Sequence, residues 1–461
     1  MLLWILCLGP AAARERAPAA AAFRVEIRTE RPEATYEIEE TAAFLVEVFD
    51  PMGRPLDYGS LDYELSSDGF AVLEKERLAL TGKPLRIEGR MERPGFLRCV
   101  ASLSEVPELA NVPVPPKGVA AAAMSPDRLT PSRELPADFE AFWEEQKQRL
   151  AAVPPDPKMR PYRLPTGHPR DVEIFDTQVR CEGDWPVSGY YARPQNAEPG
   201  SLPAVLWVHG AGVRSASAPK AASGAKEGFL SFDLNAHGIA NGQPELFYQA
   251  LERDGRLKNY RHQGRENRDG MYFRGMFLRL VRAVDFLASQ PEWDGKTLAV
   301  IGHSQGGAQA LVAGGLDERV TFVGAGVPAM CDHTGMLRKR VSGWPKLVPI
   351  LPDGRPDPVI AEVSRYYDAV NFAGRCHAEA IVSVGFIDST CPPTGCLVAY
   401  NQLRGPKTLI REPAMAHAAP LAIQEAFWEA LKAHAAARRA GEFSAAKKTA
   451  AAKPATVSRG R

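Results

Sequence analysis

Hydrophobic and polar residues alternate along the first hundred residues of the chain, as they do in β-strands with one buried face. Phe23, Val25 and Ile27 alternate with charged residues, and a second alternating run, FLVEVFD, ends in the turn sequence DPMG. Two further runs, LDYELSSDG and GFLRCVASL, follow at intervals typical of a β-sandwich. The pattern predicts an immunoglobulin-like β-sandwich domain over residues 23–105, and this region contains no acid–base pair or metal-ligand spacing.

The pattern changes after this region. Residues 106–135 are rich in Pro and Ala and predict a linker. The segment that follows, LPADFEAFWEEQKQRLAAVP, predicts an amphipathic helix. Its large apolar residues fall on one side of that helix, namely Phe139, Phe142, Trp143 and Leu150. We therefore expect a second domain to begin at residue 136.

Eight apolar runs in the second domain predict a buried sheet. They read, in order, VEIFDTQVR, VSGYYARP, PAVLWVHG, GFLSFDL, TLAVIG, FVGAGVP, EAIVSVGF and KTLIREP. From the third run onward, helical segments increasingly separate them. Buried strands joined by helical crossovers are typical of a parallel α/β sheet. We predict a mostly parallel, eight-stranded sheet flanked by helices, in a domain that spans residues 136–435.

Composition limits the cellular compartment and the classes of binding partner that we expect. Of the 461 residues, 45% are hydrophobic and 24% charged, and a formal net charge of +1 gives no reason to expect a nucleic acid or an acidic surface as partner. Residues 1–22 resemble a signal peptide, with an apolar core too short to span a membrane, so we expect an exported protein, periplasmic or secreted. The mostly basic residues 436–461 predict a disordered tail. The spacing of the cysteines beyond residue 22 matches no metal site and leaves disulfides open.

One serine lies where the fifth apolar run gives way to small helix-forming residues. The stretch LAVIGHSQGGAQALVAGG places Ser304 between Gly302 and Gly306. A nucleophile on a sharp strand-to-helix turn needs such glycines because a Cβ atom would clash there, although glycine and serine also form ordinary turns. The strand–turn–helix setting favours Ser304 as the nucleophile of an α/β-hydrolase fold.

A serine nucleophile needs a histidine to take its proton and an acid to hold that histidine. On this fold the chain order is serine, acid, histidine. Asp388 ends the seventh apolar run, at the kind of strand end where α/β sheets place their chemistry, and only His417 and His434 follow it. His434 lies in an alanine-rich terminal helix, where we expect it to be solvated, so we assign His417 as the base. The alternatives are a turn or helix-capping role for Asp388 and a structural role for His417.

The reaction also needs donors for a developing oxyanion, usually two backbone N–H groups. We assign one to Gln305, the residue after the nucleophile. The other we assign to Ala211, in the His-Gly turn that ends the third apolar run. An ordinary glycine turn is the alternative at this second position.

With these residues in place, residues 136–435 resemble the acetyl xylan esterase and cephalosporin C deacetylase family, carbohydrate esterase family seven. The resemblance rests on PADFEAFW, SGYYARP, GMYFRGMFLRLVRAVDFL, GHSQGG, YYDAVNFA and VGFIDSTCPPTGCLVAYNQL. It implies a serine esterase that removes short acyl groups, typically acetyl, from carbohydrates such as acetylated xylan or xylo-oligosaccharides. It also implies frequent homo-oligomers and no metal or organic cofactor.

Two departures from the family pattern lie near the expected site. Family members usually carry Arg-Gly-Gln after the fourth strand, where this chain reads DLNAHGIANGQP, and they tend to have His-Glu at the base, where His417 is followed by Ala418. Both departures bear on the substrate rather than on the type of reaction. The competing interpretations are a serine peptidase or general carboxylesterase on the same fold, and a non-catalytic carbohydrate-binding protein that has kept the scaffold. A peptidase of the prolyl-oligopeptidase type would need a far larger propeller than residues 23–105 can make.

Overall fold

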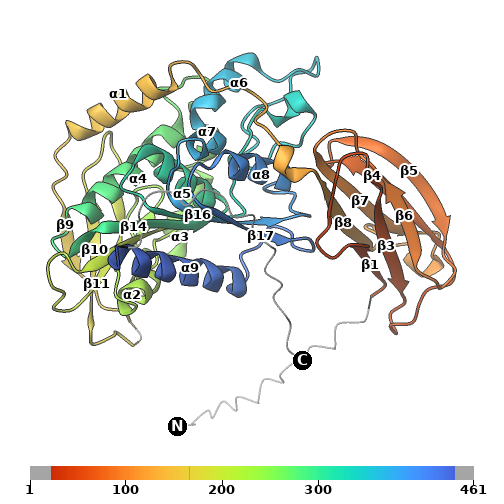
Figure 1. The fold of residues 1–461 in the computed structure, drawn as a ribbon, viewed down its shortest axis with the longest axis horizontal. Coiled ribbons are helices and arrows are strands. Elements are labelled where there is room, and N and C mark those ends of the chain that lie inside the picture. The colour runs from red at the N-terminus through yellow and green to blue at the C-terminus, as the bar shows by residue number, and fades with distance from the viewer. Residues whose placement is uncertain (1–21, 166, 442–461) are drawn as a thin grey trace, which may run out of the picture. The chain divides into compact units, whose positions relative to one another are not determined.

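The computed structural model describes residues 22–165 and 167–441, and the chain divides into two compact units, Met1–Arg128 and Leu129–Arg461 (Figure 1). Apart from residue 22, the expected signal peptide lies outside the described residues. No helix in the described ranges is long and apolar enough to cross a membrane. The six cysteines of the described residues are all buried, unpaired thiols.

The N-terminal unit consists of two β-sheets that share a hydrophobic core. The sheets have the strand orders β1-β3-β6 and β2-β8-β7-β4-β5. The strands are β1 (Arg24–Thr29), β2 (Thr35–Tyr36), β3 (Ala42–Phe49), β4 (Ser60–Ser67), β5 (Ala71–Ala79), β6 (Leu85–Gly89), β7 (Gly95–Ser104) and β8 (Lys117–Met124), followed by the 3-10 turn η2 (Pro126–Arg128). A second 3-10 turn, η1 (Pro107–Leu109), connects β7 to β8. Phe44 and Val46 alternate inward along β3, and residues of both sheets contribute to one buried cluster.

The prediction of a linker over residues 106–135 is wrong in part, because strand β8 lies within it. This strand pairs antiparallel with β7, from Gly95 opposite Met124 to Ser102 opposite Lys117. Its Ala-rich composition obscured it, since alanine is depleted in strands and signals none by itself. Small residues are needed at this position because β1 packs closely on β8: a Cβ at Gly118 would lie 2.7 Å from the carbonyl oxygen of Val25.

The second unit is built on a nine-stranded sheet in the order β17-β16-β15-β14-β12-β13-β11-β10-β9. Its strands are β9 (Lys158–Pro161), β10 (Val172–Val179), β11 (Val187–Pro194), β12 (Leu202–Val208), β13 (Leu230–Asn235), β14 (Trp293–His303), β15 (Phe322–Gly326), β16 (Glu379–Gly385) and β17 (Lys407–Glu412). The eight predicted strands are present as β10 to β17. The prediction of eight strands is nevertheless one short, because β9, a short polar edge strand that ends in proline, gave no periodic signal. Strands β12 to β17 are parallel to one another, whereas β11, β10 and β9 each run antiparallel to the strand beside them.

Helices cover both faces of this sheet. Figure 1 shows α2 (Ala218–Lys226) and α9 (Leu421–Arg439) on one face, with α4 (Tyr272–Ala288) and α5 (Gln305–Leu316) on the other. The predicted amphipathic helix is α1 (Phe139–Ala151), which buries all four expected apolar residues. The remaining helical segments are α3 (Glu245–Arg253), η3 (Tyr260–His262), η4 (Gly335–Arg338), α6 (Pro358–Ser364), η5 (Arg365–Tyr367), α7 (Ala369–Ala373) and α8 (Pro393–Gln402).

Helix α9 corrects the predicted boundary of the tail. The tail was expected to begin at residue 436, but the helix continues to Arg439. Its buried face, which includes Phe427 and Leu431, packs on the sheet and carries the helix past that point. Residues 442–461 lie outside the described residues.

Candidate active site

A strained serine joins strand β14 to helix α5. Ser304 has φ 59° and ψ −124°, a conformation that costs energy for any residue with a Cβ atom. Its backbone N–H donates to the carbonyl oxygen of Gly326, 2.8 Å away, which ties the turn to the neighbouring strand β15. The Ser304 side chain is only partly buried, so the turn presents a hydroxyl at the C-terminal edge of the sheet.

The two flanking glycines are required by close backbone packing. A Cβ at Gly302 would lie 2.5 Å from the carbonyl oxygen of Val208, and one at Gly306 would lie 2.3 Å from the same atom. A Cβ atom essentially never lies this close to a non-bonded carbonyl oxygen, so any larger residue would displace the end of β12. The prediction that a Cβ atom would clash at both positions is confirmed.

The structure brings the three predicted triad residues together at this edge. Asp388 follows β16 and His417 follows β17. The Nε2 atom of His417 lies 3.0 Å from the Ser304 Oγ, and its Nδ1 atom lies 2.7 Å from Oδ2 of Asp388. A carboxylate can only accept, so Nδ1 carries the proton and Nε2 is left to accept the Ser304 hydroxyl. This arrangement suits transfer of the serine proton to the imidazole.

Asp388 is held in place by its own loop. Its side chain is almost completely buried, and Oδ1 accepts hydrogen bonds from the backbone N–H groups of Thr390 and Cys391, at 2.8 and 2.9 Å. The aspartate therefore caps a turn and also binds His417 through its second oxygen. The turn role that the sequence left open as an alternative coexists with the contact to the histidine.

The two residues expected to supply oxyanion donors both belong to segments next to Ser304. Gln305 is the first residue of α5, and the first N–H groups of a helix have no acceptor within it. Ala211 lies in the turn after β12, and this turn passes directly beside the nucleophile. A Cβ on Gly210 would lie 3.6 Å from the Cβ of Ser304.

Two other histidines near Ser304 are unsuited to act as its base. Burial lowers the pKa of His209 to about 4. Burial, together with the nearby charge of Lys220, also lowers the pKa of His303 to about 4. The Nε2 atom of His209 already accepts the backbone N–H of Ala236 at 3.1 Å. Of the histidines that the structure describes, His417 is the one hydrogen-bonded to Ser304.

The segment DLNAHGIANGQP stands where members of the resembled family usually carry Arg-Gly-Gln, and it supports the turn beside Ser304. The amide nitrogen of Asn235 donates to the carbonyl oxygen of Arg214, 3.0 Å away, and Asn235 Oδ1 accepts the backbone N–H of His237 at 3.0 Å. Sequence analysis assigned no role to these residues. The available signal was that polar residues follow β13 at the same edge of the sheet as Ser304.

One group of three side chains in the described residues could hold a metal ion. The potential ligand atoms of Asp388, Cys391 and His417 lie within 4.8 Å of one another. Burial, reinforced by the Asp388 charge, raises the pKa of the Cys391 thiol well above its usual range, and both ring nitrogens of His417 are already hydrogen-bonded. A metal ion would have to break one of those bonds, so the residues fit proton transfer better than metal binding.

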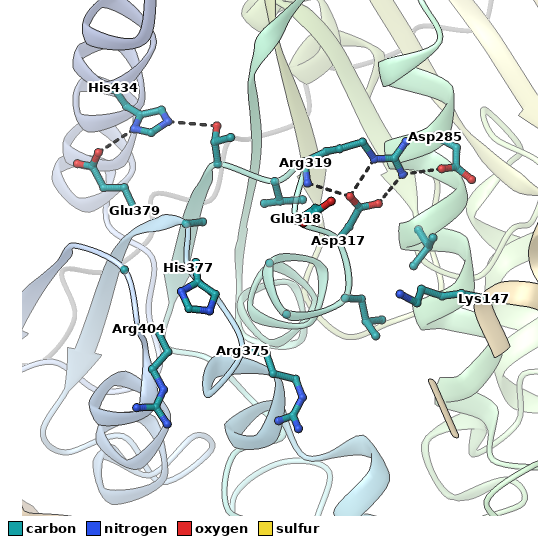
Figure 2. A pocket seen from close by; sticks show the side chains of 18 of the residues that line it. Lys147, Asp285, Asp317, Glu318, Arg319, Arg375, His377, Glu379, Arg404 and His434 are labelled. Atoms are coloured by element: carbon teal, nitrogen blue, oxygen red, sulfur yellow. Dashed lines mark hydrogen bonds and ion pairs between the residues drawn. The ribbon is translucent and has the colours of Figure 1, made fainter. Parts of the chain in front are cut away.

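A cavity of about 1040 Å³ lies at the opposite end of the strands (Figure 2). Its lining includes residues that precede β15, β16 and β17, whereas Ser304, Asp388 and His417 follow the other ends of the strands. Charged side chains in the cavity bind one another: Arg319 pairs with both Asp317 and Asp285. This cavity is therefore separate from the candidate active site.

His434 lies beside this cavity, and the prediction that it is solvated is wrong. The residue is 3% exposed. Its Nδ1 atom lies 2.7 Å from Oε2 of Glu379, and its Nε2 atom lies 3.2 Å from Oγ1 of Thr321 (Figure 2). The side chain is buried because positions three and seven residues apart share one face of a helix, which places His434 beside Leu431 and Phe427.

This chain is similar to known acetyl esterases. The acetyl xylan esterase (AXE1) family matches residues 124–432. The acetyl esterase Axe7A of Xylanibacter ruminicola is 30% identical over 358 residues, which cover 77% of this chain and 78% of that protein. This alignment is longer than the unit Leu129–Arg461, so it includes part of the N-terminal unit, which sequence analysis had placed outside the family resemblance.

Solved structures of esterases share the fold. An acetyl xylan esterase from a Paenibacillus species has a TM-score of 0.58 and 25% identity, covering 67% of this chain and 98% of its own. Acetyl xylan esterase 1 from a Thermoanaerobacterium species has a TM-score of 0.52 and 20% identity, covering 66% and 96%, which shows the fold alone. The large mixed sheet is that of the α/β-hydrolase esterases.

Proposed function

The chain belongs to the acetyl xylan esterase family and is a carboxylic ester hydrolase that acts on acetyl esters, and from this premise we propose that Ser304, His417 and Asp388 form its catalytic triad. The observation that carries the proposal is the hydrogen-bonded chain from Ser304 Oγ through His417, at 3.0 Å, to the buried Asp388, at 2.7 Å. A fluorophosphonate probe tests it directly. We expect the probe to label the protein at Ser304, and labelling at any other residue would contradict the assignment.

In the proposed reaction Ser304 is acetylated, and water then hydrolyses the acetyl-enzyme ester. Ser304 Oγ attacks the acetyl carbonyl carbon while His417 takes its proton at Nε2, and Asp388 stabilises the resulting imidazolium. The N–H groups of Ala211 and Gln305 bind the oxyanion of the tetrahedral intermediate. His417 then protonates the departing alcohol. A water molecule, deprotonated by the same nitrogen, releases acetate and restores the Ser304 hydroxyl.

We expect Asp388→Asn to lower kcat by about 10⁴, the size of effect seen when a triad acid loses its charge elsewhere. Backbone N–H groups of Thr390 and Cys391 occupy Oδ1, so the asparagine oxygen should take that place and turn its NH₂ group toward His417. The imidazole Nδ1 would then have to accept, which moves the ring proton to Nε2 and leaves no base for Ser304. Steady-state kinetics on a small acetyl ester measure this effect. A variant with native circular dichroism and activity within tenfold of wild type would contradict the role of Asp388.

The natural substrate is proposed to be acetylated xylan or xylo-oligosaccharide. Support comes from the family and from the acetyl xylan esterases that share the fold. A panel of acetylated sugars, compared with other esters and with dipeptide amides, tests this proposal. Faster turnover of a long-chain ester or an amide than of every acetylated sugar would favour a general carboxylesterase or a peptidase instead.

We further propose that the N-terminal unit is an immunoglobulin-like module that is not needed to build the catalytic triad. Its two antiparallel-rich sheets with a shared core support this classification. The family match begins at residue 124, where the last strand of the unit ends. All three residues of the proposed triad lie in the second unit, Leu129–Arg461.

A protein that begins near residue 125 is expected to hydrolyse a small acetyl ester within about tenfold of the full chain, a barrier change of at most about 1.4 kcal/mol. Any loss of activity should appear on acetylated polymer, where a module that held the polymer would raise the local concentration of substrate. Circular dichroism and size exclusion would verify that the shortened protein is folded and soluble. A folded, soluble protein without activity on the small ester would show that the N-terminal unit helps to build the active site.

Export is also proposed, on the strength of the apolar core and small residues in positions 1–22. Sequencing the N-terminus of the mature protein recovered outside the cytoplasm tests it. An intact residue 1 in protein that stays in the cytoplasm would contradict export.

A further inference from the structure

A buried tyrosine connects the two sides of the proposed oxyanion site. The hydroxyl of Tyr260 donates to Oε1 of Gln305 at 2.8 Å and accepts the backbone N–H of Gly212 in a longer bond of 3.4 Å. Gly212 directly follows Ala211, and Gln305 is itself the second proposed donor residue. A single hydroxyl therefore contacts the turn that carries one donor and the side chain of the residue that carries the other.

Gly212 is also held on its carbonyl side. The Nε2 atom of His237 lies 3.1 Å from the Gly212 carbonyl oxygen, and its Nδ1 atom lies 2.6 Å from the hydroxyl of Tyr272. Burial lowers the pKa of His237 to about 3, so the ring is neutral and has one donor and one acceptor. The carbonyl can only accept, so Nε2 donates to Gly212 and the Tyr272 hydroxyl donates to Nδ1.

The contacts of Gln305 and Tyr260 leave little freedom for either side chain. Gln305 is fully buried, and its amide nitrogen has no hydrogen-bond partner among the described residues. Its bond to Tyr260 is thus the contact that fixes the amide. The Tyr260 ring is 4% exposed and packs edge-on against His237, with ring centroids 4.6 Å apart.

We propose that Tyr260 is a positioning residue that fixes the separation of the Ala211 and Gln305 N–H groups, with His237 holding the same turn from its carbonyl side. The inference rests on the proposed function, in which these two N–H groups bind the oxyanion. Donors fixed before the reaction stabilise developing charge without reorganising, whereas a displacement near one ångström costs up to about a hundredfold in rate. The substrate itself is not contacted by Tyr260 in this proposal.

The test is Tyr260→Phe, which keeps the ring and removes the hydroxyl. We expect kcat for a small acetyl ester to fall by about ten- to a hundredfold, with KM changed less than threefold. Affinity for a trifluoromethyl ketone, whose adduct with serine carries an oxyanion, should fall by the same factor as kcat/KM. A purely structural role would not make these two quantities change together.

Tyr248→Phe is the matched control. The Tyr248 hydroxyl is also buried, donates to the carbonyl oxygen of Ala240 at 3.0 Å and accepts the N–H of Gln243 at 3.1 Å. Neither of these partners belongs to the turn at Gly212, so we expect the Tyr248→Phe enzyme to have a kcat within twofold of wild type. An equal loss of kcat in both variants would attribute the effect to general loosening and overturn the proposal.

A second pair of variants keeps the proposal testable if Tyr260→Phe is unstable. His237→Ala should lower kcat by about tenfold, and His237→Gln, whose amide N–H can still reach the Gly212 carbonyl, should recover most of it. Equal activities of these two variants, or a Tyr260→Phe enzyme with wild-type kcat, would overturn the positioning role. If the positioning role is overturned but Ser304→Ala is inactive in the same assays, the proposed function still holds. An active Ser304→Ala enzyme would overturn both.

Discussion

Replacement of Ser304 by alanine is expected to lower kcat for a small acetyl ester by about 10⁶, the loss typical of a triad without its nucleophile. The hydroxyl lies 3.0 Å from the imidazole of His417, on a strained turn between β14 and α5. Alanine tolerates the same backbone conformation as serine and fills the space of the Cβ atom. The fold should therefore survive the substitution.

Kinetics with protein free of contaminating esterase would measure this loss. Ser364→Ala is a suitable control, because Ser364 is also buried and its hydroxyl donates only to the carbonyl oxygen of Ala361, at 2.9 Å. That variant should keep wild-type kcat. Activity of Ser304→Ala within tenfold of wild type would exclude Ser304 as the nucleophile.

Replacement of His417 by alanine should be about as damaging as the serine change, near 10⁶ in kcat, because the serine proton would have no acceptor at the nucleophile. The double variant Ser304→Ala with His417→Ala should be no slower than either single variant, since the two residues act as a unit. Steady-state and single-turnover assays on the three proteins would measure these effects. Multiplicative losses would indicate that the two residues act independently.

His434→Ala provides the contrast for this prediction. Its buried ring binds the partly buried Glu379 and Thr321 at the other end of the strands, so its removal breaks both contacts and leaves a space beneath α9. We expect a lower free energy of unfolding, by about 1–3 kcal/mol, with kcat of the folded protein unchanged. A folded but inactive His434→Ala protein together with an active His417→Ala protein would show that the wrong histidine was selected.

The replacement of Arg-Gly-Gln has a structural consequence. In this chain Asn235 and His237 contact the backbone of the turn that follows β12, at Arg214 and Gly212. The segment therefore supports the turn from within the fold by hydrogen bonds to carbonyl oxygens. The segment that the sequence left as a question about substrate thus also has a structural role in this chain.

Local rules let the sequence predict most of the second unit. Eight of its nine strands, all but the polar edge strand β9, contain apolar runs that are recognisable without their neighbours. The glycines at 302 and 306 signalled a tight strand-to-helix turn, because only a residue without a Cβ atom fits so close to Val208. Chain order then selected Asp388 and His417, since the fold admits only one succession of serine, acid and histidine.

Tertiary structure decided what depends on contacts between distant segments. The alanines of β8 form a strand because β7 supplies its hydrogen bonds, and composition alone predicted a linker there. His434 became a buried partner of Glu379 because α9 packs on the sheet, which an alanine-rich sequence does not reveal. The contacts of Tyr260 with Gly212 and Gln305 join residues 48 and 45 positions apart. The sequence by itself determined β10 to β17 and the turn at Ser304, because these follow from neighbouring residues, and the chain order typical of the fold then selected the proposed triad. The supports around that triad were decided only by the folded chain, because a hydrogen bond between distant residues leaves no periodic trace in the sequence.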